Sequence, residues 1–412
     1  MSPFVPVVPR RVEDLRPAAG DEAIERLRDA ASALAGARVL QVSSTAYGGG
    51  VAELLHTQVA LLNDLGIHAD WQVIEGTPEF FAVTKAVHNA LQGADLAWTP
   101  EMERIYLERC HANAAALPDG YDFVIVHDPQ PAAVLSMLED EGRRSGKWAW
   151  RCHIDLSAPS PSAWEFFAGH VARYDGAVFT MPDFVRPGLQ GPMTFTIPPS
   201  IDPVSDKNLT LADDVVRQVL ARYGVDPTRP IATQISRFDP WKDPTGVIDA
   251  YRLAHEELPD LQLLMVASMA ADDPEGQYYF ELTEAHRNGD ADVHLLSNLD
   301  GVGNVEVNAF QRASDVIVQK SIREGFGLVV AEGLWKGRPV IGGNAGGIRL
   351  QIEEGVSGFL VDSVEVCAGR MVRLLLDPDE RARMGASGRE RVRQRFLTPR
   401  ELEDYLRMLA AL

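Results

Sequence analysis

The chain has 412 residues, 46% of them hydrophobic and 24% charged, which is typical of a soluble globular protein and too long for one ordinary core. Its 39 basic and 59 acidic residues give a net charge of −20, which disfavours general binding to nucleic acid or to acidic membranes. A small anion in a local basic pocket is still compatible with this charge. Lysine is scarce, occurring only at positions 85, 147, 207, 242, 320 and 336, so a lysine inside a motif carries extra weight.

The cysteines and the N-terminus indicate the compartment. Cys110, Cys152 and Cys367 form no Cys-x-x-Cys pair, which favours reduced thiols over a disulfide framework or a zinc site. The N-terminus lacks the apolar segment of a secretory leader, and no run reaches the ~18 apolar residues of a membrane span. We therefore expect a cytoplasmic protein that binds neither nucleic acid nor membrane.

Short apolar runs predict a series of strands, six in each half of the chain. They lie at 38–44, 68–74, 122–127, 148–154, 176–181 and 193–198, then at 231–236, 261–268, 292–297, 315–320, 338–343 and 358–361. The intervals carry helical periodicity, as in residues 51–66, and strands that alternate with helices indicate parallel sheets. The sequence thus predicts an α/β protein of two doubly wound domains, 1–200 and 201–398, with the Pro-rich stretch 198–207 as linker.

Open α/β sheets bind ligands beyond the carboxyl ends of their strands, and two such sheets facing each other would enclose a central cleft. The first strand is followed by Ser-Thr-Ala-Tyr-Gly-Gly-Gly at 44–50, where glycines let backbone amides approach a ligand at a helix N-terminus. A tight turn that binds nothing is the alternative. The absence of Gly-x-Gly-x-x-Gly counts against a dinucleotide oxidoreductase.

The strand at 231–236 leads into a loop that carries Arg237 and Lys242. Asp243 and Pro244 read as the N-cap and the first residue of the next helix, so both cations lie on one strand-to-helix loop. Cations in this place are suited to a diphosphate. Two solvated surface cations are the alternative.

The strand at 315–320 leads to a second loop with Glu324, Gly325 and Gly327. The glycines open a helix whose free amides suit a phosphate, and Glu332 lies within that helix. Carboxylates accept hydrogen bonds from sugar and ribose hydroxyls. A capping glutamate and an unrelated helical glutamate are the alternative.

Arg237 and Lys242 together with Glu324 and Glu332 resemble the motifs of family-4 retaining glycosyltransferases, which have the GT-B fold of two Rossmann-like domains. The resemblance extends over nearly the whole chain and is most specific in its C-terminal half, at 332–340 and 355–361. Segments 127–130, 151–155 and 308–314 narrow it to the trehalose glycosyltransferring synthases, with trehalose phosphorylases as close relatives.

The resemblance implies that the first domain binds the acceptor and the second the nucleotide sugar, with a C-terminal helix at about 399–411 packing back on the first domain. Arg237 and Lys242 would neutralise the donor diphosphate, and amides near Gly327 would bind the distal phosphate. Glu324 would bind the transferred glucose and Glu332 the ribose. With the edge 297–299 expected near the base, the donor-binding residues are Ser236, Arg237, Lys242, Ser297, Asn298, Glu324, Gly325, Phe326, Gly327, Leu328 and Glu332.

On the acceptor side, His153 matches the histidine that approaches the donor sugar and joins Arg237, Lys242 and Glu324 as an expected catalytic residue. The expected acceptor-side residues are Gly49, Gly50, Lys85, His88, His127, Asp128, His153 and Asp155. Each has a structural alternative: a buried histidine, a loop cap at Asp155, a capped strand end at 127–128, and surface positions for Lys85 and His88.

The implied reaction is reversible, front-face transfer of glucose from a nucleoside-diphosphate glucose to glucose, which forms α,α-trehalose with retention. No metal or other cofactor is expected, because the Asp-x-Asp strings at 290–292 and 377–379 look like exposed helix-end turns. We expect a homodimer. A trehalose phosphorylase, a family-4 transferase with another acceptor and a non-catalytic sugar- or nucleotide-binding regulator are the alternatives, and uridine, adenosine and guanosine donors all stay open.

Overall fold

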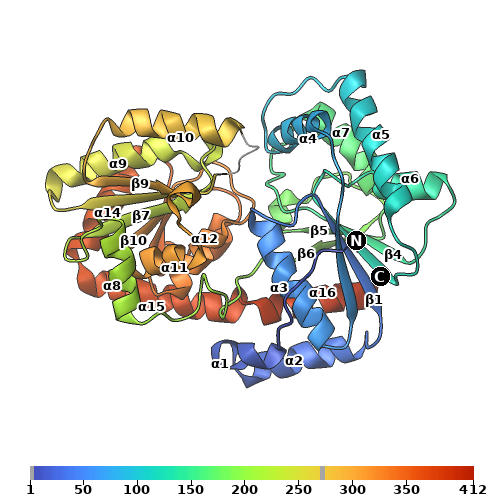
Figure 1. Cartoon of the computed structure of the whole chain (residues 1–412), viewed down its shortest axis with the longest axis horizontal. Helices are drawn as coiled ribbons and strands as arrows, with labels where there is room; N and C mark the ends of the chain where they lie inside the picture. Colours follow the sequence, from blue (N-terminus) through green and yellow to red (C-terminus); the bar gives the residue numbers. More distant parts are fainter. Residues whose placement is uncertain (1–3, 270–273) are drawn as a thin grey trace. The chain divides into compact units, whose positions relative to one another are not determined.

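The computed structural model describes residues 4–269 and 274–412, and the chain divides into two compact units. Unit 1 comprises Met1–Ser200 and Thr398–Leu412, and unit 2 comprises Ile201–Leu397. The chain passes from unit 1 to unit 2 after Ser200 and returns to unit 1 at Thr398. Each unit is a six-stranded parallel sheet with helices on both faces, so the expected doubly wound α/β architecture is confirmed (Figure 1).

The sheet of unit 1 has the strand order β2-β1-β3-β4-β5-β6. Its strands are β1 (Arg38–Ser43), β2 (His68–Val73), β3 (Phe123–His127), β4 (Lys147–Arg151), β5 (Gly176–Phe179) and β6 (Met193–Thr196). Its helices are α1 (Arg16–Ala19), α2 (Asp21–Ser32), α3 (Gly50–Asp64), α4 (Pro78–Leu91), α5 (Pro100–Ala116), α6 (Val134–Asp140), α7 (Pro161–Val171) and α16 (Thr398–Ala411). The chain runs from β1 outward to β2 and then returns to β3, so the strand order reverses between β1 and β3.

Unit 2 repeats this plan with the order β12-β11-β10-β7-β8-β9. Its strands are β7 (Ile231–Ser236), β8 (Gln262–Ala267), β9 (Val293–Ser297), β10 (Val316–Gln319), β11 (Val340–Gly343) and β12 (Gly358–Val361). Its helices are α8 (Asp213–Arg222), α9 (Pro244–Glu257), α10 (Pro274–Arg287), α11 (Asn304–Ala313), α12 (Leu328–Trp335), α13 (Ile348–Gln351), α14 (Val364–Leu376) and α15 (Pro378–Arg395). Here the order reverses between β7 and β10.

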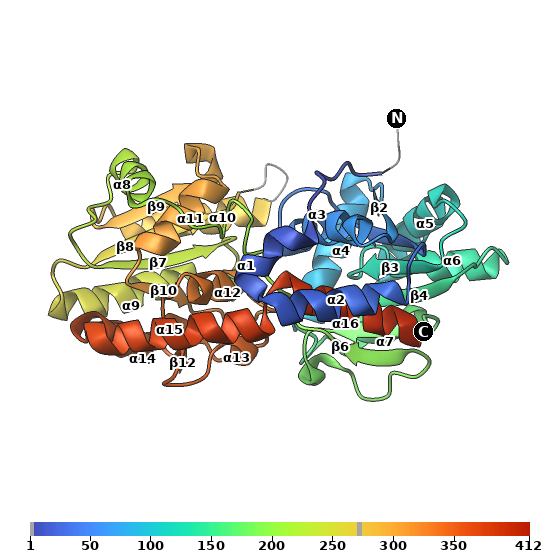
Figure 2. The same cartoon turned by 90° about the horizontal axis from the view of Figure 1, so that it is seen from below.

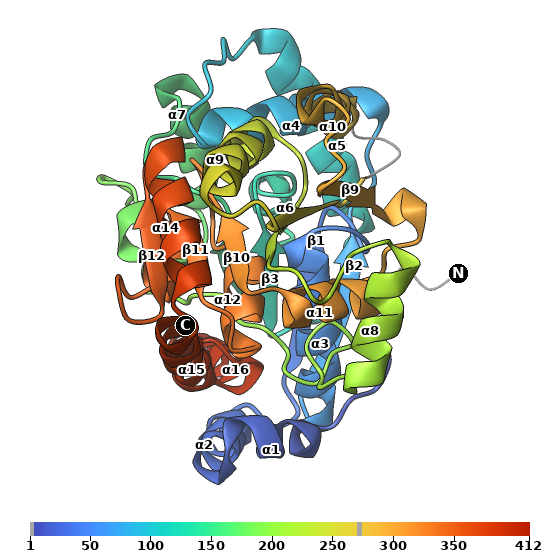
Figure 3. The same cartoon turned by 90° about the vertical axis from the view of Figure 1, so that its left-hand side faces the viewer.

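Both faces of the unit 2 sheet are buried, which is why its strands read as continuous apolar runs. Ala232 of β7 belongs to the core formed with α9 and α14, whereas Ile231 and Ile235 belong to the core formed with α8 and α11. Figure 3 shows these two pairs of helices on opposite sides of the sheet. Successive residues of one strand therefore pack against helices on opposite faces, as the pleat requires.

The last helix, α16, packs against α2 within unit 1 (Figure 2). Arg26 of α2 pairs with Glu403 of α16 at 3.2 Å, and the Ser200 hydroxyl donates to Glu401 at 2.5 Å. Burial raises the pKa of Glu401. Both contacts lie within unit 1, close to the two points where the chain leaves for unit 2 and returns from it.

The predicted strands are all present, but several are shorter than expected. The strand expected at 148–154 ends at Arg151, so His153 and Asp155 lie in the following loop. The stretch 198–207 is not an exposed linker, because Ser200 and Ile201 are buried and the Ile201 amide donates to the Phe396 carbonyl at 2.9 Å. Among the residues that the structure describes, no helix combines the length and apolar character needed to cross a membrane.

Gly343, the last residue of β11, tests how closely the strand ends of unit 2 are packed. A β-carbon there would lie 1.9 Å from the Ser321 carbonyl oxygen, whereas one at Gly369 on α14 would have no neighbour within 4 Å. We expect Gly343→Ala to lower the free energy of unfolding by about 2 kcal/mol or more. Gly369→Ala, the control, should raise it by about 0.5–1 kcal/mol. Equal melting temperatures for the two variants in calorimetry would contradict this packing.

Candidate active site

Two loops meet at the centre of the unit 2 sheet, one after β7 and one after β10. These strands are neighbours in the sheet although β8 and β9 lie between them in the sequence. The Ile322 amide of the second loop donates to the Trp241 carbonyl of the first at 2.8 Å. Because the strand order reverses here, this edge is where an open α/β sheet binds its ligand.

An ion pair joins the same two loops. Lys242 Nζ lies 2.7 Å from Glu324 Oε2, and the two side chains are only 15% and 10% exposed. Ser321 Oγ and Gln319 Nε2 donate to the same carboxylate oxygen at 3.2 and 3.5 Å. Lys242 is therefore not a solvated surface cation, and Glu324 is held by three donors.

The backbone around Lys242 is fixed by its neighbours. Asp239 caps the short 3-10 turn Pro240–Lys242, and Gln234 Nε2 donates to the Lys242 carbonyl at 2.9 Å. Asp243 has left-handed backbone (φ 48°) and caps α9, as predicted, by accepting from the Gly246 amide at 3.2 Å. The buried Lys320 at the end of β10 donates to the Asp243 carboxylate. The direction of Lys242 is thus set before any ligand binds.

Arg237 differs from Lys242 in its exposure. Its side chain is 48% exposed, and its guanidinium lies 4.0 Å from Asp239 Oδ2. The preceding Ser236 is buried, and its hydroxyl has no hydrogen-bond partner in the described part of the chain. Two cations of different exposure thus follow β7.

The loop after β10 enters α12 through Gly327, which has φ 81° and acts as the N-cap. Gln351 Nε2 donates to the carbonyls of Phe326 and Gly327 at 2.6 and 3.2 Å, and the Phe326 ring packs against Phe396 at 5.6 Å. Gly325 and Leu328, on either side, are half-buried. The first-turn amides of a helix lack partners within it, so α12 presents donors at this edge.

Glu332 and the segment after β9 have contacts of their own. Glu332 is fully buried, accepts from Gln311 Nε2 at 2.9 Å and lies 3.5 Å from Lys207 Nζ. Ser297 caps the turn Asn298–Asp300, because its hydroxyl accepts from the Leu299 amide and donates to the Asp300 carboxylate. The exposed Asn298 is bonded to both backbone groups of Met269.

In unit 1 the structure brings two predicted histidines together. His127, the last residue of β3, has its Nδ1 2.9 Å from Nε2 of His153. The next residue, Asp128, has left-handed backbone (φ 64°) and accepts from the His153 amide at 2.8 Å. The loop after β4 is therefore fixed to the end of β3.

Burial sets the protonation of this cluster. It lowers the pKa of His127 to about 3 and that of His153 well below its usual value, and the charge of Arg151 lowers both further. Arg151 is paired with His127 in the sheet and is fully buried, and its guanidinium has no hydrogen-bond partner among the described residues. Burial also raises the pKa of Asp128 to about 6. Both histidines are consequently neutral at pH 7.

The other acceptor-side residues lie on α3, on α4 and in the loop after β4. Gly49 has φ 79° and caps α3, whose first residue is Gly50. Asp155 accepts from the Ser157 amide at 2.8 Å, which is the loop-cap alternative. Lys85 and His88 are half-buried, one turn apart on α4.

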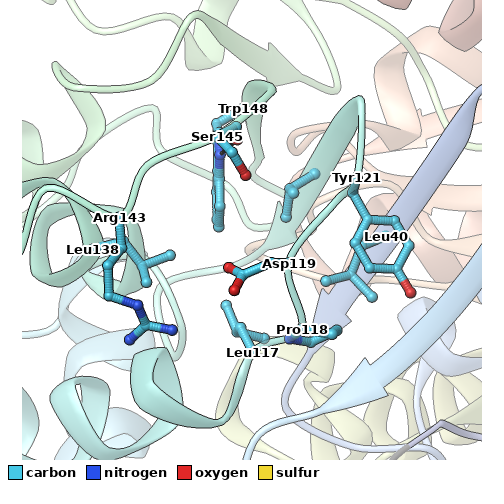
Figure 4. Close-up of a pocket in the computed structure, with 10 residues that line it drawn as sticks. Leu40, Leu117, Pro118, Asp119, Tyr121, Leu138, Arg143, Ser145 and Trp148 are labelled. Atoms are coloured by element: carbon cyan, nitrogen blue, oxygen red, sulfur yellow. Dashed lines mark hydrogen bonds between the residues drawn. The ribbon is translucent and has the colours of Figure 1, made fainter.

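The pocket in Figure 4 lies away from these strand ends, where the chain approaches the beginnings of β3 and β4. Its lining includes Leu117, Asp119, Tyr121, Arg143 and Trp148. Its volume of about 10 Å³ is that of a single water at most, so it is no site for a sugar. In the described parts of the chain no group of three His, Cys, Asp or Glu side chains is placed to hold a metal ion.

Comparison with known proteins identifies the family. Residues 41–186 match the family model "Trehalose synthase, N-terminal domain", and residues 217–391 match "Glycosyl transferases group 1". The chain is 47% identical to a trehalose synthase of Pyrococcus horikoshii over 98% of its own length and 97% of the relative. It belongs to the trehalose synthase family.

The same comparisons confirm the GT-B fold and show how distant a trehalose phosphorylase is from this chain. An α,α-trehalose 6-phosphate synthase from Burkholderia multivorans superposes with a TM-score of 0.72 at 17% identity, over 91% of this chain and 99% of the other. A trehalose phosphorylase of Pleurotus pulmonarius is more distant, at 27% identity over 81% of this chain and 52% of its own. Membership of the synthase family makes this chain a hexosyltransferase.

Several residues of the site do not emerge from the sequence. Gln41 sits inside a strand and carries no motif. Arg151 lies in the segment 151–155 that supports the family resemblance, yet only the strand order shows that both residues flank His127. Only the scarcity of lysine could have drawn attention to Lys207 and Lys320, which are two of the six lysines in the sequence. Gln311 lies in the segment 308–314 that supports the family resemblance, yet its contact with Glu332 becomes visible only in the structure.

The Lys242–Glu324 pair can be tested by a double-mutant cycle. Lys242→Met should lower the free energy of unfolding by about 1–3 kcal/mol, because it leaves the buried Glu324 without its cation. The double variant Lys242→Met/Glu324→Gln should recover part of this loss. The effects of the two single substitutions on the free energy of unfolding are then not additive in denaturation experiments.

Lys147→Met is the matched control, since Lys147 is 49% exposed and lies 3.4 Å from Asp175. It should change stability by less than about 1 kcal/mol. Additive effects at 242 and 324 would show that the pair is not coupled.

Proposed function

We propose that this protein transfers a glucosyl group from a nucleoside-diphosphate glucose to glucose, reversibly and with retention, to form α,α-trehalose. The observation that carries the proposal is the 47% identity to a trehalose synthase over 98% of the chain. The geometry at the end of β7 and β10 supports it, because it supplies the charges that this transfer needs.

Unit 2 holds the donor in this proposal. Cleavage of the glycosidic C–O bond leaves negative charge on the diphosphate, which Arg237, Lys242 and the first-turn amides of α12 stabilise. Groups that are oriented beforehand act most strongly in the transition state, and each such donor is typically worth ~10²–10³ in rate. Lys242 is oriented by its ion pair with Glu324, and the half-exposed Arg237 supplies the second cation.

Glu324 binds the transferred glucose. Its three hydrogen bonds all involve Oε2, which leaves Oε1 without a partner among the described residues. A carboxylate oxygen in this state accepts from a sugar hydroxyl. In this proposal Glu324 is a positioning acceptor and not a covalent nucleophile, in accord with front-face transfer.

Unit 1 binds glucose through the loop that ends at Gly49 and the edge formed by His127, Asp128 and His153. The neutral histidines suit an uncharged sugar. The proposal includes no metal, because the cations of unit 2 carry the leaving-group charge. It also includes a homodimer located in the cytoplasm.

A donor and acceptor screen tests the reaction. Uridine, adenosine and guanosine diphosphate glucose would each be offered with glucose or glucose 6-phosphate, and the product identified by NMR. We expect α,α-trehalose from glucose, undiminished by exhaustive EDTA. Trehalose incubated with nucleoside diphosphate should release glucose, whereas trehalose with inorganic phosphate should not.

Release by phosphate alone would assign a phosphorylase instead. Loss of activity with EDTA and recovery with Mg²⁺ or Mn²⁺ would show that a metal is required. Lys242→Ala, the inactive comparison, should lose at least ~10²-fold in kcat.

The two carboxylates of unit 2 should have separable effects on binding. Glu332→Gln should weaken both the free nucleoside diphosphate and the nucleotide sugar, because the ribose is common to them. Glu324→Gln should harm transfer and hardly change affinity for the free diphosphate, which has no glucose to lose. Calorimetric titration measures this, with Glu401→Gln, a buried glutamate of unit 1, as the control for general destabilisation. The reverse pattern would mean that the two roles are exchanged.

A further inference from the structure

A hydrogen-bonded chain of three side chains crosses the centre of the unit 1 sheet. Gln41 of β1 pairs with Ile125 of β3, so His127, two residues further on, projects from the same face. Gln41 Oε1 lies 2.7 Å from His127 Nε2, and His127 Nδ1 lies 2.9 Å from His153 Nε2. Gln41 and His127 are each 2% exposed, whereas His153 is partly exposed.

The hydrogen bonds that link Gln41, His127 and His153 all run in one direction. An amide oxygen only accepts, so His127 must carry its proton on Nε2 and present a lone pair at Nδ1. His153 then donates to that lone pair from Nε2–H, and its own Nδ1 is left as a lone pair. No described residue forms a hydrogen bond with this Nδ1.

The surrounding charges keep the rings neutral. Arg151 lies beside His127 in the sheet and opposes a second positive charge, while Asp128 binds the backbone of His153 rather than either ring. A neutral imidazole has only one proton, and Gln41 decides which nitrogen of each ring holds it.

We propose that Gln41 is a positioning residue that fixes His153 as a hydrogen-bond acceptor at Nδ1, so that the ligand group it meets is a sugar hydroxyl and not an anionic oxygen. This inference rests on the proposed function for the identity of the sugar. It adds a residue from the middle of β1 that acts on the site through His127.

Nitrogen-15 NMR of histidine-labelled protein tests the chain directly, with His127→Gln and His153→Gln used to assign the two rings among the ten histidines. We expect both rings neutral at pH 7, each with protonated Nε2 and unprotonated Nδ1. Addition of trehalose should shift the His153 Nδ1 resonance without protonating it. A proton on His153 Nδ1, or a charged ring, would overturn the proposal.

Gln41→Glu should reverse the chain, because a buried carboxylate favours a doubly protonated His127 that donates to His153 and moves its proton to Nδ1. We expect the reversed spectrum and a fall in kcat/KM for trehalose formation of roughly tenfold or more. Gln72→Glu is the control, since Gln72 is a buried glutamine of the neighbouring strand β2 whose amide bonds the Ala116 carbonyl. Gln72→Glu should change the melting temperature by as much as Gln41→Glu does and should leave the histidine spectrum unaltered.

Should Gln41→Glu fail to fold, Gln41→Met removes the acceptor without adding charge and should leave His127 in a mixture of tautomers. An unchanged spectrum and unchanged kcat/KM in a folded Gln41 variant would contradict the proposal. The spectrum is read without turnover, so a protein that shows it yet forms no trehalose refutes the proposed function and not the hydrogen-bonded chain.

Discussion

The reversal of strand order in each sheet is the constraint on which the candidate residues of both units depend. Where the order reverses, two neighbouring strands send their loops to opposite faces and leave the edge between them open. In unit 2 this edge lies between β7 and β10, and the bond from Ile322 to Trp241 joins the two loops that flank it. In unit 1 it lies between β1 and β3, which places Gln41 next to His127. Residues more than eighty positions apart become neighbours only because of this topology.

Charge is arranged differently at the two edges. The chain has a net charge of −20, so an anionic donor is attracted only by local cations. Three lysines of unit 2 lie in ion pairs: Lys242 with Glu324, Lys320 with Asp243 and Lys207 with Glu332. Burying such pairs gives little net stability, but removal of either partner leaves a charge uncompensated. Their value here is orientation, because each pair fixes a loop or a carboxylate that the proposed reaction uses.

The strands and the helix caps can be predicted from the sequence, because they depend on residues that are close together in the chain. Apolar runs gave the strands, and the Asp243–Pro244 cap and the glycine before α12 were recognisable from short-range chemistry. Long-range pairing was not accessible. Nothing in the sequence shows that Arg151 would lie beside His127, that the strand at 148 ends before His153, or that Glu332 would be buried against Gln311. These facts follow from strand register and helix packing, which a residue's own neighbours in the chain do not determine.

The contrast between the two edges fits the two substrates of the proposed reaction. A diphosphate leaving group develops charge, and the edge of unit 2 meets it with cations and helix amides that are already in place. A sugar acceptor is neutral at every stage until its hydroxyl attacks, and the edge of unit 1 presents neutral imidazoles whose protons are assigned by a buried amide. A cationic histidine would also attract phosphate and so weaken discrimination between a free sugar and its phosphorylated form. In the proposed reaction, unit 1 is selective through hydrogen-bond direction, because burial beside Arg151 keeps both rings uncharged, and unit 2 is selective through charge.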